Sequence, residues 1–184
     1  MELTFLFADV RGSTAIAEKI SPTAFTAVMN RFFGVANRVL VRSDAYIDKL
    51  VGDEVVGFYM PYLGPDNSRR AVETGRELLI ATGHQDEDGP WLPVGVGINT
   101  GVAFVGSVGT PDGRTDFTAM GDVVNVTARF SSLATAGEII IGDTAWNRVA
   151  LANERSEVRL IEVKGKTDPL RVHVLKVAPP GNGH

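Results

Sequence analysis

The chain contains no cysteine among its 184 residues. Disulfide bonds, thiolate metal sites and a cysteine nucleophile are therefore excluded. The three histidines, His84, His173 and His184, are scattered along the chain without the spacing of a metal site. A metal ion in this protein must therefore be held by oxygen ligands.

Long apolar runs are also absent, since no stretch approaches the roughly 18 apolar residues of a membrane span. No basic segment precedes an apolar one at the N-terminus, as a secretory signal would require. These features predict a cytoplasmic protein with no membrane contact in this segment, and they leave open an anchor elsewhere in a longer parent. The net charge of -4 argues against nucleic acid as a partner, because its recognition relies on clustered Lys and Arg.

Several common catalytic motifs are missing: the sequence has no GxxxxGK[ST] phosphate loop, no HExxH and no GxSxG. Gly95, Gly97 and Gly101 imitate a dinucleotide fingerprint, but the third glycine falls one place late and the segment lies between strands. Binding of phosphate must therefore use metal ions and basic side chains.

The hydrophobic pattern predicts one α+β domain over 1–177, with a flexible tail over 178–184. Apolar residues at three- and four-residue steps predict a helix from Ser21-Pro22 through Val39, and further helices over 68–82 and 122–133. Strands are expected at 3–10, 45–50, 54–59, 94–98, 102–108, 138–141, 158–163 and 170–177. This order favours a ferredoxin-like arrangement, with helices packed on an antiparallel sheet.

Two aspartates lie where predicted strands end. Asp9 closes the first strand, and Asp53 lies at the tip of the hairpin between 45–50 and 54–59. Two carboxylates held close repel each other unless a cation or a proton lies between them, so a shared Mg²⁺ site is one interpretation. The other is a helix N-cap at Asp9 and a plain turn residue at Asp53, which spacing alone favours about two to one.

Asn125 and Arg129 are four residues apart and share one face of the third predicted helix. An amide beside a guanidinium can hold a ribose and a phosphate, and arginine can stabilise charge at a transferred phosphorus. A solvated polar stripe explains the spacing equally well. Lys49 is typical of an edge strand, Thr118 of an ordinary strand and Lys164 of a solvated turn.

Taken together and in order, five segments resemble the catalytic domain of class III adenylate and guanylate cyclases. The segments are Phe7–Thr14, Lys49–Asp53, Gly97–Gly101, Phe117–Arg129 and Val163–Lys166. Their joint occurrence is specific, and the resemblance extends from residue 3 to about 177. It implies an adenylate cyclase, a homodimer that converts ATP into 3',5'-cyclic AMP and pyrophosphate with two divalent ions, Mg²⁺ or Mn²⁺.

The resemblance also implies a role for each matching position. Asp9 and Asp53, with the backbone carbonyl of Val10, would bind the metal ions. Lys49 and Thr118 would read the edge of the adenine base.

The remaining matched positions would act on the sugar and the phosphates. Asn125 would orient the ribose, Arg129 would stabilise the α-phosphate in the transition state and Lys164 would hold the terminal phosphates. In this family the metal aspartates come from one subunit, while the base readers, the asparagine and the arginine come from the other. A homodimer would then contain two equivalent sites.

Three positions bear on the substrate and the activity. Thr118 stands where many relatives have aspartate, which resembles a bacterial subgroup of adenylate cyclases, and Lys49 stands where guanylate cyclases place an acidic residue. Ser13 replaces a phenylalanine that is common in the family. The alternatives are a guanylate cyclase and a non-catalytic nucleotide-binding module for dimerisation or sensing. A diguanylate cyclase is disfavoured because its GGDEF-type hairpin is absent.

Overall fold

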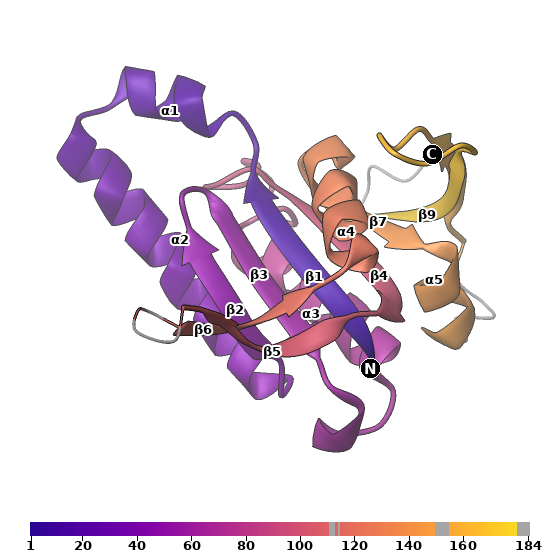
Figure 1. Cartoon of the computed structure of the whole chain (residues 1–184). Coiled ribbons are helices and arrows are strands. Elements are labelled where there is room, and N and C mark those ends of the chain that lie inside the picture. Colours follow the sequence, from indigo (N-terminus) through magenta and orange to yellow (C-terminus); the bar gives the residue numbers. More distant parts are fainter. Residues whose placement is uncertain (111–112, 114, 150–154, 180–184) are drawn as a thin grey trace.

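The computed structural model describes residues 1–110, 113, 115–149 and 155–179 (Figure 1). Within these residues a seven-stranded sheet runs in the order β2-β3-β1-β4-β7-β9-β8, and β5 and β6 form a separate hairpin. The strands are β1 (Glu2–Val10), β2 (Tyr46–Val51), β3 (Glu54–Tyr59), β4 (Val94–Val102), β5 (Phe104–Gly109), β6 (Thr115–Met120), β7 (Glu138–Gly142), β8 (Glu157–Ile161) and β9 (Leu170–Lys176). The helices are α1 (Ser13–Lys19), α2 (Pro22–Arg42), α3 (Asn67–Ala81), α4 (Asp122–Leu133) and α5 (Asp143–Val149), with a 3₁₀ turn over Pro61–Leu63.

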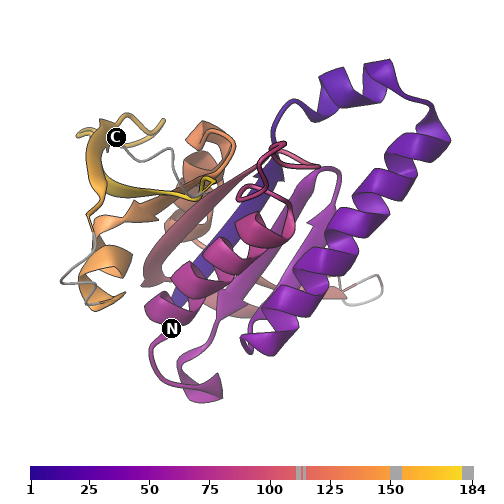
Figure 2. The ribbon, with the colours of Figure 1, turned by 180° about the vertical axis from the view of Figure 1, so that it is seen from behind.

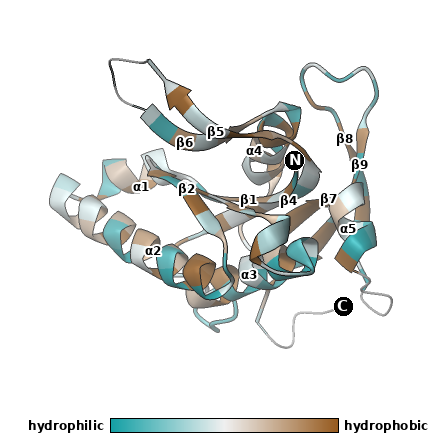
Figure 3. Ribbon diagram, turned by 60° about the horizontal axis from the view of Figure 1, so that its bottom comes forward, coloured by the Kyte–Doolittle hydropathy of each residue, from teal (hydrophilic) through white to brown (hydrophobic). Residues whose placement is uncertain are grey.

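Strand β1 is an interior strand of the sheet, because it pairs with β3 on one side and with β4 on the other. Its side chains alternate between two buried layers. Leu6 and Ala8 join the core under α2 and α3, which cover one face of the sheet (Figure 2). Phe5 and Phe7 join the core on the opposite face, beneath α4 and the β5–β6 hairpin (Figure 3).

The predicted α+β class is confirmed, and three helices lie close to where the periodicity places them. The N-cap of α2 is Ser21, whose Oγ accepts a hydrogen bond from the backbone nitrogen of Ala24 at 3.2 Å. The expected antiparallel sheet needs one correction, since β4 and β7 are parallel. A parallel pair requires a crossover connection, and the chain between these strands supplies it with α4.

Other sequence-based boundaries were wrong. The break expected at residues 99–101 does not exist, because β4 pairs with β1 without interruption from Val94 to Val102 and this pairing overrides the local turn preference. Helix α1 was not expected. None of its residues is fully buried, and Ile16 is its one residue that packs against the core, so its apolar pattern is too weak to detect. Helix α5 was also missed, because it is only seven residues long.

The predicted tail over 178–184 is not tested, because residues 180–184 lie outside the described residues. In the part of the chain that the structure describes, no helix combines the length and the apolar character that crossing a membrane requires.

A buried ion pair ties the C-terminal strands together. Glu138, at the start of β7, accepts hydrogen bonds from Arg159 at 2.7 and 3.1 Å and from the backbone nitrogen of Thr135 at 3.0 Å. These bonds, chiefly those from Arg159, lower the pKa of Glu138 from 4.5 to about 2 against the opposing effect of burial.

The folded-state pKa of Glu138 lies below the unfolded value, so its contribution to stability is complete above about pH 4.5 and is lost as the pH falls toward 2. We expect Glu138→Gln to lower the free energy of unfolding at pH 7 by on the order of 2 kcal/mol and to flatten its decline on acidification. Urea unfolding at several pH values measures both effects. The exposed Glu157, which also pairs with Arg159, provides the control variant Glu157→Gln. If the free energy of unfolding declined equally with falling pH in the wild type and in Glu138→Gln, this assignment would be contradicted.

Candidate active site

The end of β1 brings Asp9 and Asp53 into one neighbourhood. Asp9 is paired with Glu54 in the register of β1 and β3. The next residue, Val10, donates its backbone N–H to the carbonyl oxygen of Asp53 at 3.0 Å, which fixes the β2–β3 turn against the end of β1. The helix N-cap interpretation of Asp9 is wrong, since α1 begins after Gly12 and Asp9 belongs to β1.

The carboxylates of this cluster influence one another. Burial raises the pKa of Asp9, and the negative charge of Asp53 raises it further, while Arg11 opposes both effects. Burial also raises the pKa of Glu54, followed by the charges of Asp9 and Asp53. Sequence reasoning missed Glu54 as a third acidic neighbour, although it directly follows Asp53.

Two further side chains hold the aspartates in place. The guanidinium of Arg11 forms an ion pair with Asp9 and donates to the carbonyl oxygen of Ser132, at the end of α4, at 2.8 Å. The hydroxyl of Ser13 donates to Oδ2 of Asp53 at 2.5 Å. Sequence analysis noted Ser13 only as a departure from the family, and it did not single out Arg11.

The donor set suits a divalent cation that shares its ligands with a substrate. Among the residues that the structure describes, no group of three acidic or histidine side chains is arranged to hold a metal ion. Mg²⁺ is usually bound through one or two protein carboxylates, with phosphate oxygens and water completing its shell. Asp9 and Asp53 supply two carboxylates, which is the protein share of ligands that such a site uses.

A second group of site residues surrounds a pocket of about 470 Å³ between α4 and the loop that joins β8 to β9. Asn125 and Arg129 from α4 line it together with Lys164 from the loop, and all three side chains are exposed. Lys166 fixes the loop to the start of α4 through an ion pair with Asp122 at 2.6 Å. The shared helix face predicted from the spacing is therefore present.

A third group lies between β2 and β6, where Lys49 and Thr118 line a pocket of about 430 Å³. Strand β2 is at the edge of the sheet, as the ordinary interpretation of Lys49 expected, and the lysine side chain is 57% exposed. Thr118 differs from an ordinary strand residue, because its Oγ1 is buried and has no hydrogen-bond partner among the residues that the structure describes. Neither aspartate is among the residues that line the pockets of the basic groups.

The glycines that imitated a dinucleotide fingerprint have a packing role. They lie at alternate positions of β4 and face α4, where a Cβ at Gly95 would lie 2.6 Å from the carbonyl oxygen of Ala134. At Gly97 it would lie 2.7 Å from the carbonyl oxygen of Thr127 and would also collide with the backbone nitrogen of Ser131. Only glycine at these positions lets α4 approach the sheet this closely.

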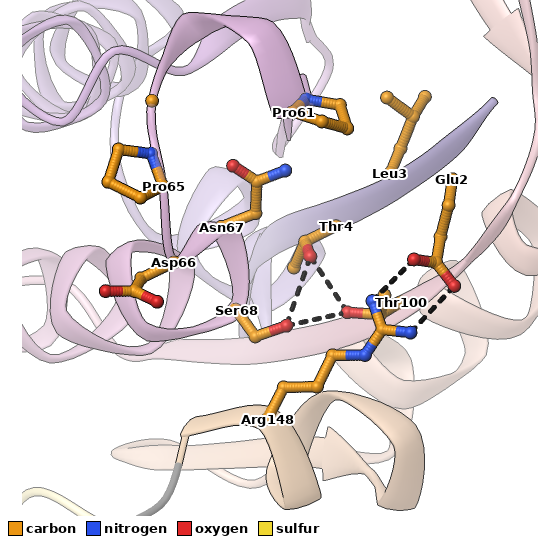
Figure 4. A pocket seen from close by; sticks show the side chains of 11 residues that line it. Glu2, Leu3, Thr4, Pro61, Pro65, Asp66, Asn67, Ser68, Thr100 and Arg148 are labelled. Atoms are coloured by element: carbon orange, nitrogen blue, oxygen red, sulfur yellow. Dashed lines mark hydrogen bonds and ion pairs between the residues drawn. The ribbon is translucent and has the colours of Figure 1, made fainter.

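Another pocket, of about 420 Å³, lies at the opposite end of β1 (Figure 4). The hydroxyls of Thr4, Ser68 and Thr100 pair with one another there at 2.8 to 3.3 Å. Arg148 forms a two-bond ion pair with Glu2. These groups satisfy one another, so this pocket gives no indication of a ligand.

Residues 1–177 match the family model described as the adenylate and guanylate cyclase catalytic domain. The chain belongs to this family. It is 26% identical, over 95% of its length, to an adenylate cyclase from Anabaena cylindrica, of which it covers 36%. It spans well under half the length of the curated relatives that it matches first.

Solved structures of this cyclase family have the same fold. The guanylyl cyclase Cya2 superposes with a TM-score of 0.83 at 31% identity, with 99% of this chain and 95% of that one covered. The adenylyl cyclase CyaB from P. aeruginosa also gives 0.83, at 28% identity, with 95% of this chain and 94% of that one covered. The similar proteins thus include some that are named adenylyl cyclases and some that are named guanylyl cyclases.

The contact of α4 with β4 predicts that Gly97 is essential to the cyclase fold. We expect Gly97→Ala to lower the free energy of unfolding by about 1–3 kcal/mol, because the new methyl group must displace α4. The matched control is Gly34→Ala within α2, where a Cβ would meet only the flexible end of Arg38 at 3.7 Å. The control should gain up to about 1 kcal/mol from helix propensity. Thermal unfolding of both variants measures the contrast, and equal melting temperatures would refute the packing role.

Proposed function

We propose that this chain is an adenylate cyclase catalytic domain, which converts ATP into 3',5'-cyclic AMP and pyrophosphate at sites shared between two copies. The observation that carries the proposal is the separation of the functional groups. One chain holds two carboxylates at the end of β1, and it holds Asn125, Arg129 and Lys164 around a pocket that neither carboxylate lines. A triphosphate bound through metal ions needs both sets, which two copies together provide.

An exposed apolar surface supports the pairing of copies. The residues Val102, Phe104 and Met120 around the β5–β6 hairpin are 74%, 59% and 52% exposed. The hairpin stands over one face of the sheet, and part of it is hydrophobic (Figure 3). Apolar patches of this kind mark interaction surfaces. A homodimer that covers this face is the partner we propose, and ATP is the substrate.

In the proposed reaction the ribose 3'-oxygen attacks the α-phosphorus, and the proton of the 3'-hydroxyl passes to water. The bond from the α-phosphorus to the oxygen that bridges to the β-phosphorus breaks, and pyrophosphate leaves. Asp9 and Asp53, with the carbonyl of Val10, would hold Mg²⁺ or Mn²⁺. When bound, such ions supply positive charge to the triphosphate and lower the pKa of the 3'-hydroxyl.

The partner's copies of the basic and amide groups complete the site. The guanidinium of Arg129 is suited to bind α-phosphate oxygens as their charge develops, because its planar fork matches a phosphoryl group. The amide of Asn125, on the same face of α4, would bind the ribose, and Lys164, across the same pocket, would bind the terminal phosphates. The protein therefore positions the nucleotide and neutralises its charge.

GTP is the competing substrate, because the chain is similar to the guanylyl cyclase Cya2. The ammonium of Lys49 only donates hydrogen bonds. Adenine presents an acceptor at N1, whereas guanine presents an N–H there. This complementarity favours ATP.

We expect a kcat/KM at least about tenfold higher for ATP than for GTP, because one hydrogen bond to a charged group gives that discrimination. Quantifying the cyclic product from each nucleotide with Mn²⁺ or Mg²⁺ measures it. A higher kcat/KM for GTP would make the chain a guanylate cyclase. Tight nucleotide binding with no cyclic product would make it a non-catalytic module.

The composite site predicts complementation between inactive variants. Asp53→Ala and Arg129→Ala should each lose at least about a hundredfold in kcat, since each removes a charge that the transition state needs. In an equal mixture of the two, half of the dimers carry one intact site, so about a quarter of the wild-type activity should return.

The matched control mixes Asp53→Ala with Asp9→Ala, which damage the same half of the site. That mixture should show no recovery. Recovery in the control, or none in the Asp53→Ala and Arg129→Ala mixture, would argue against a site shared between copies.

A further inference from the structure

Two acidic residues, Asp48 and Asp116, line the pocket between β2 and β6; Asp116 is exposed and the side chain of Asp48 is buried. Asp48 lines this pocket next to Lys49, with Thr118 across from them on β6. Its side chain is only 6% exposed, whereas that of Lys49 is 57% exposed. The carboxylate is therefore an internal part of the pocket wall, and its burial requires an explanation.

A β-bulge puts Asp48 in this position. The register between β2 and β3 shifts between Ile47 and Lys49, which leaves Asp48 as the extra residue. Neighbouring residues of a regular strand point to opposite faces, and a bulge removes this alternation locally. Asp48 and Lys49 thus both line the pocket, and their charged atoms Oδ2 and Nζ lie 3.7 Å apart.

The second oxygen of Asp48 has no partner. Among the described residues three buried side-chain atoms lack a hydrogen bond: Asp48 Oδ1, Thr118 Oγ1 and Arg70 Nε. Two of the three belong to residues that line this one pocket. A buried polar atom without a partner costs about 1–3 kcal/mol, so two such oxygens in one pocket indicate a ligand that donates two hydrogen bonds.

The walls of the pocket suit a planar base. Phe117, which is 45% exposed, lines it, and the ring of Tyr46 meets that of Phe117 edge-on at 5.4 Å. Aromatic side chains provide a surface on which a base can lie.

We propose that Asp48 is a specificity-determining residue for adenine, an inference that rests on the proposed adenylate cyclase function. The 6-amino group of adenine has two N–H donors. One binds Oδ1 of Asp48 and the other binds Oγ1 of Thr118, while Lys49, held near Asp48, donates to N1. Guanine carries an oxygen at position 6, whose lone pairs face a carboxylate that can only accept. Asp48 therefore favours ATP and disfavours GTP.

The test compares ATP with purine riboside 5'-triphosphate, which has the same ring system without the 6-amino group. For Asp48→Ala we expect kcat/KM on ATP to fall about 10- to 100-fold, the range of a hydrogen bond to a charged group. On purine riboside triphosphate it should change by less than about threefold, since that substrate offers Asp48 no donor. Asp48→Asn, which keeps the shape and one acceptor oxygen, should lose less on ATP than Asp48→Ala and should gain activity on GTP.

The control variant Glu87→Ala removes an exposed carboxylate from the loop before β4 and should leave both values unchanged. An equal loss on both nucleotides for Asp48→Ala and Asp48→Asn would overturn the inference, because Asp48 would then act through Lys49 or through the fold. A loss of GTP activity in Asp48→Asn and Asp48→Ala would overturn it too, since the carboxylate would then be binding guanine.

Equilibrium binding separates this inference from the proposed function. If the wild type makes no cyclic product, the proposed function fails, and titration with the same two triphosphates still tests Asp48. A preference for ATP that disappears in Asp48→Ala supports the inference. An unchanged preference, or no binding of either nucleotide, overturns it.

Discussion

Backbone pairing, and not any attraction between their side chains, holds Asp9 and Asp53 together. The ladder between β1 and β3 sets Asp9 opposite Glu54, and the hydrogen bond from Val10 closes the β2–β3 turn against the strand end. Burial opposes the charge of Asp9 and raises its pKa, and the negative charge of Asp53 adds a smaller effect in the same direction. Burial of β1 on both faces fixes the register, because a slip of one residue would turn every core side chain to the wrong layer. The core of the domain therefore stabilises a cluster of charges that repel one another.

The acidic and the basic groups lie on different elements, and the pocket of the basic groups is not lined by either aspartate. Helix α4 carries Asn125 and Arg129, and its distance from the sheet is set by the glycines of β4. Arg11 bridges the two regions, since it pairs with Asp9 and also binds the end of α4 at Ser132. The separation is what makes a second copy useful in the proposed mechanism.

The parts of the fold that the sequence predicts are those with a strong periodic pattern. Helices α2, α3 and α4 each bury one apolar stripe and lie close to their predicted positions. The uninterrupted course of β4 depends on its partner β1, and α1 has no fully buried side chain, so neither is visible in a local pattern. The parallel pairing of β4 with β7 joins segments about 40 residues apart in sequence, and local sequence patterns do not predict such a pairing.

For the site, spacing alone left Asp9 and Asp53 ambiguous, and the family resemblance made them candidates. The contacts of Arg11 and Ser13 with these aspartates depend on side-chain placement after the turn that follows β1, which composition does not encode. Asp48 was missed because alternation in a regular strand would turn it away from Lys49, and the bulge appears only once β2 is paired with β3.

A crystal structure of the chain with Mn²⁺ and 3'-deoxy-ATP, which lacks the attacking hydroxyl, tests the central claim most directly. The account predicts one nucleotide between two copies, with its phosphates and metal ions at Asp9 and Asp53 of one copy. The base should lie at Lys49 and Thr118 of the other copy, and the α-phosphate at Arg129 of that same copy. A nucleotide bound by groups of a single copy, or one that does not contact these residues, would contradict the account.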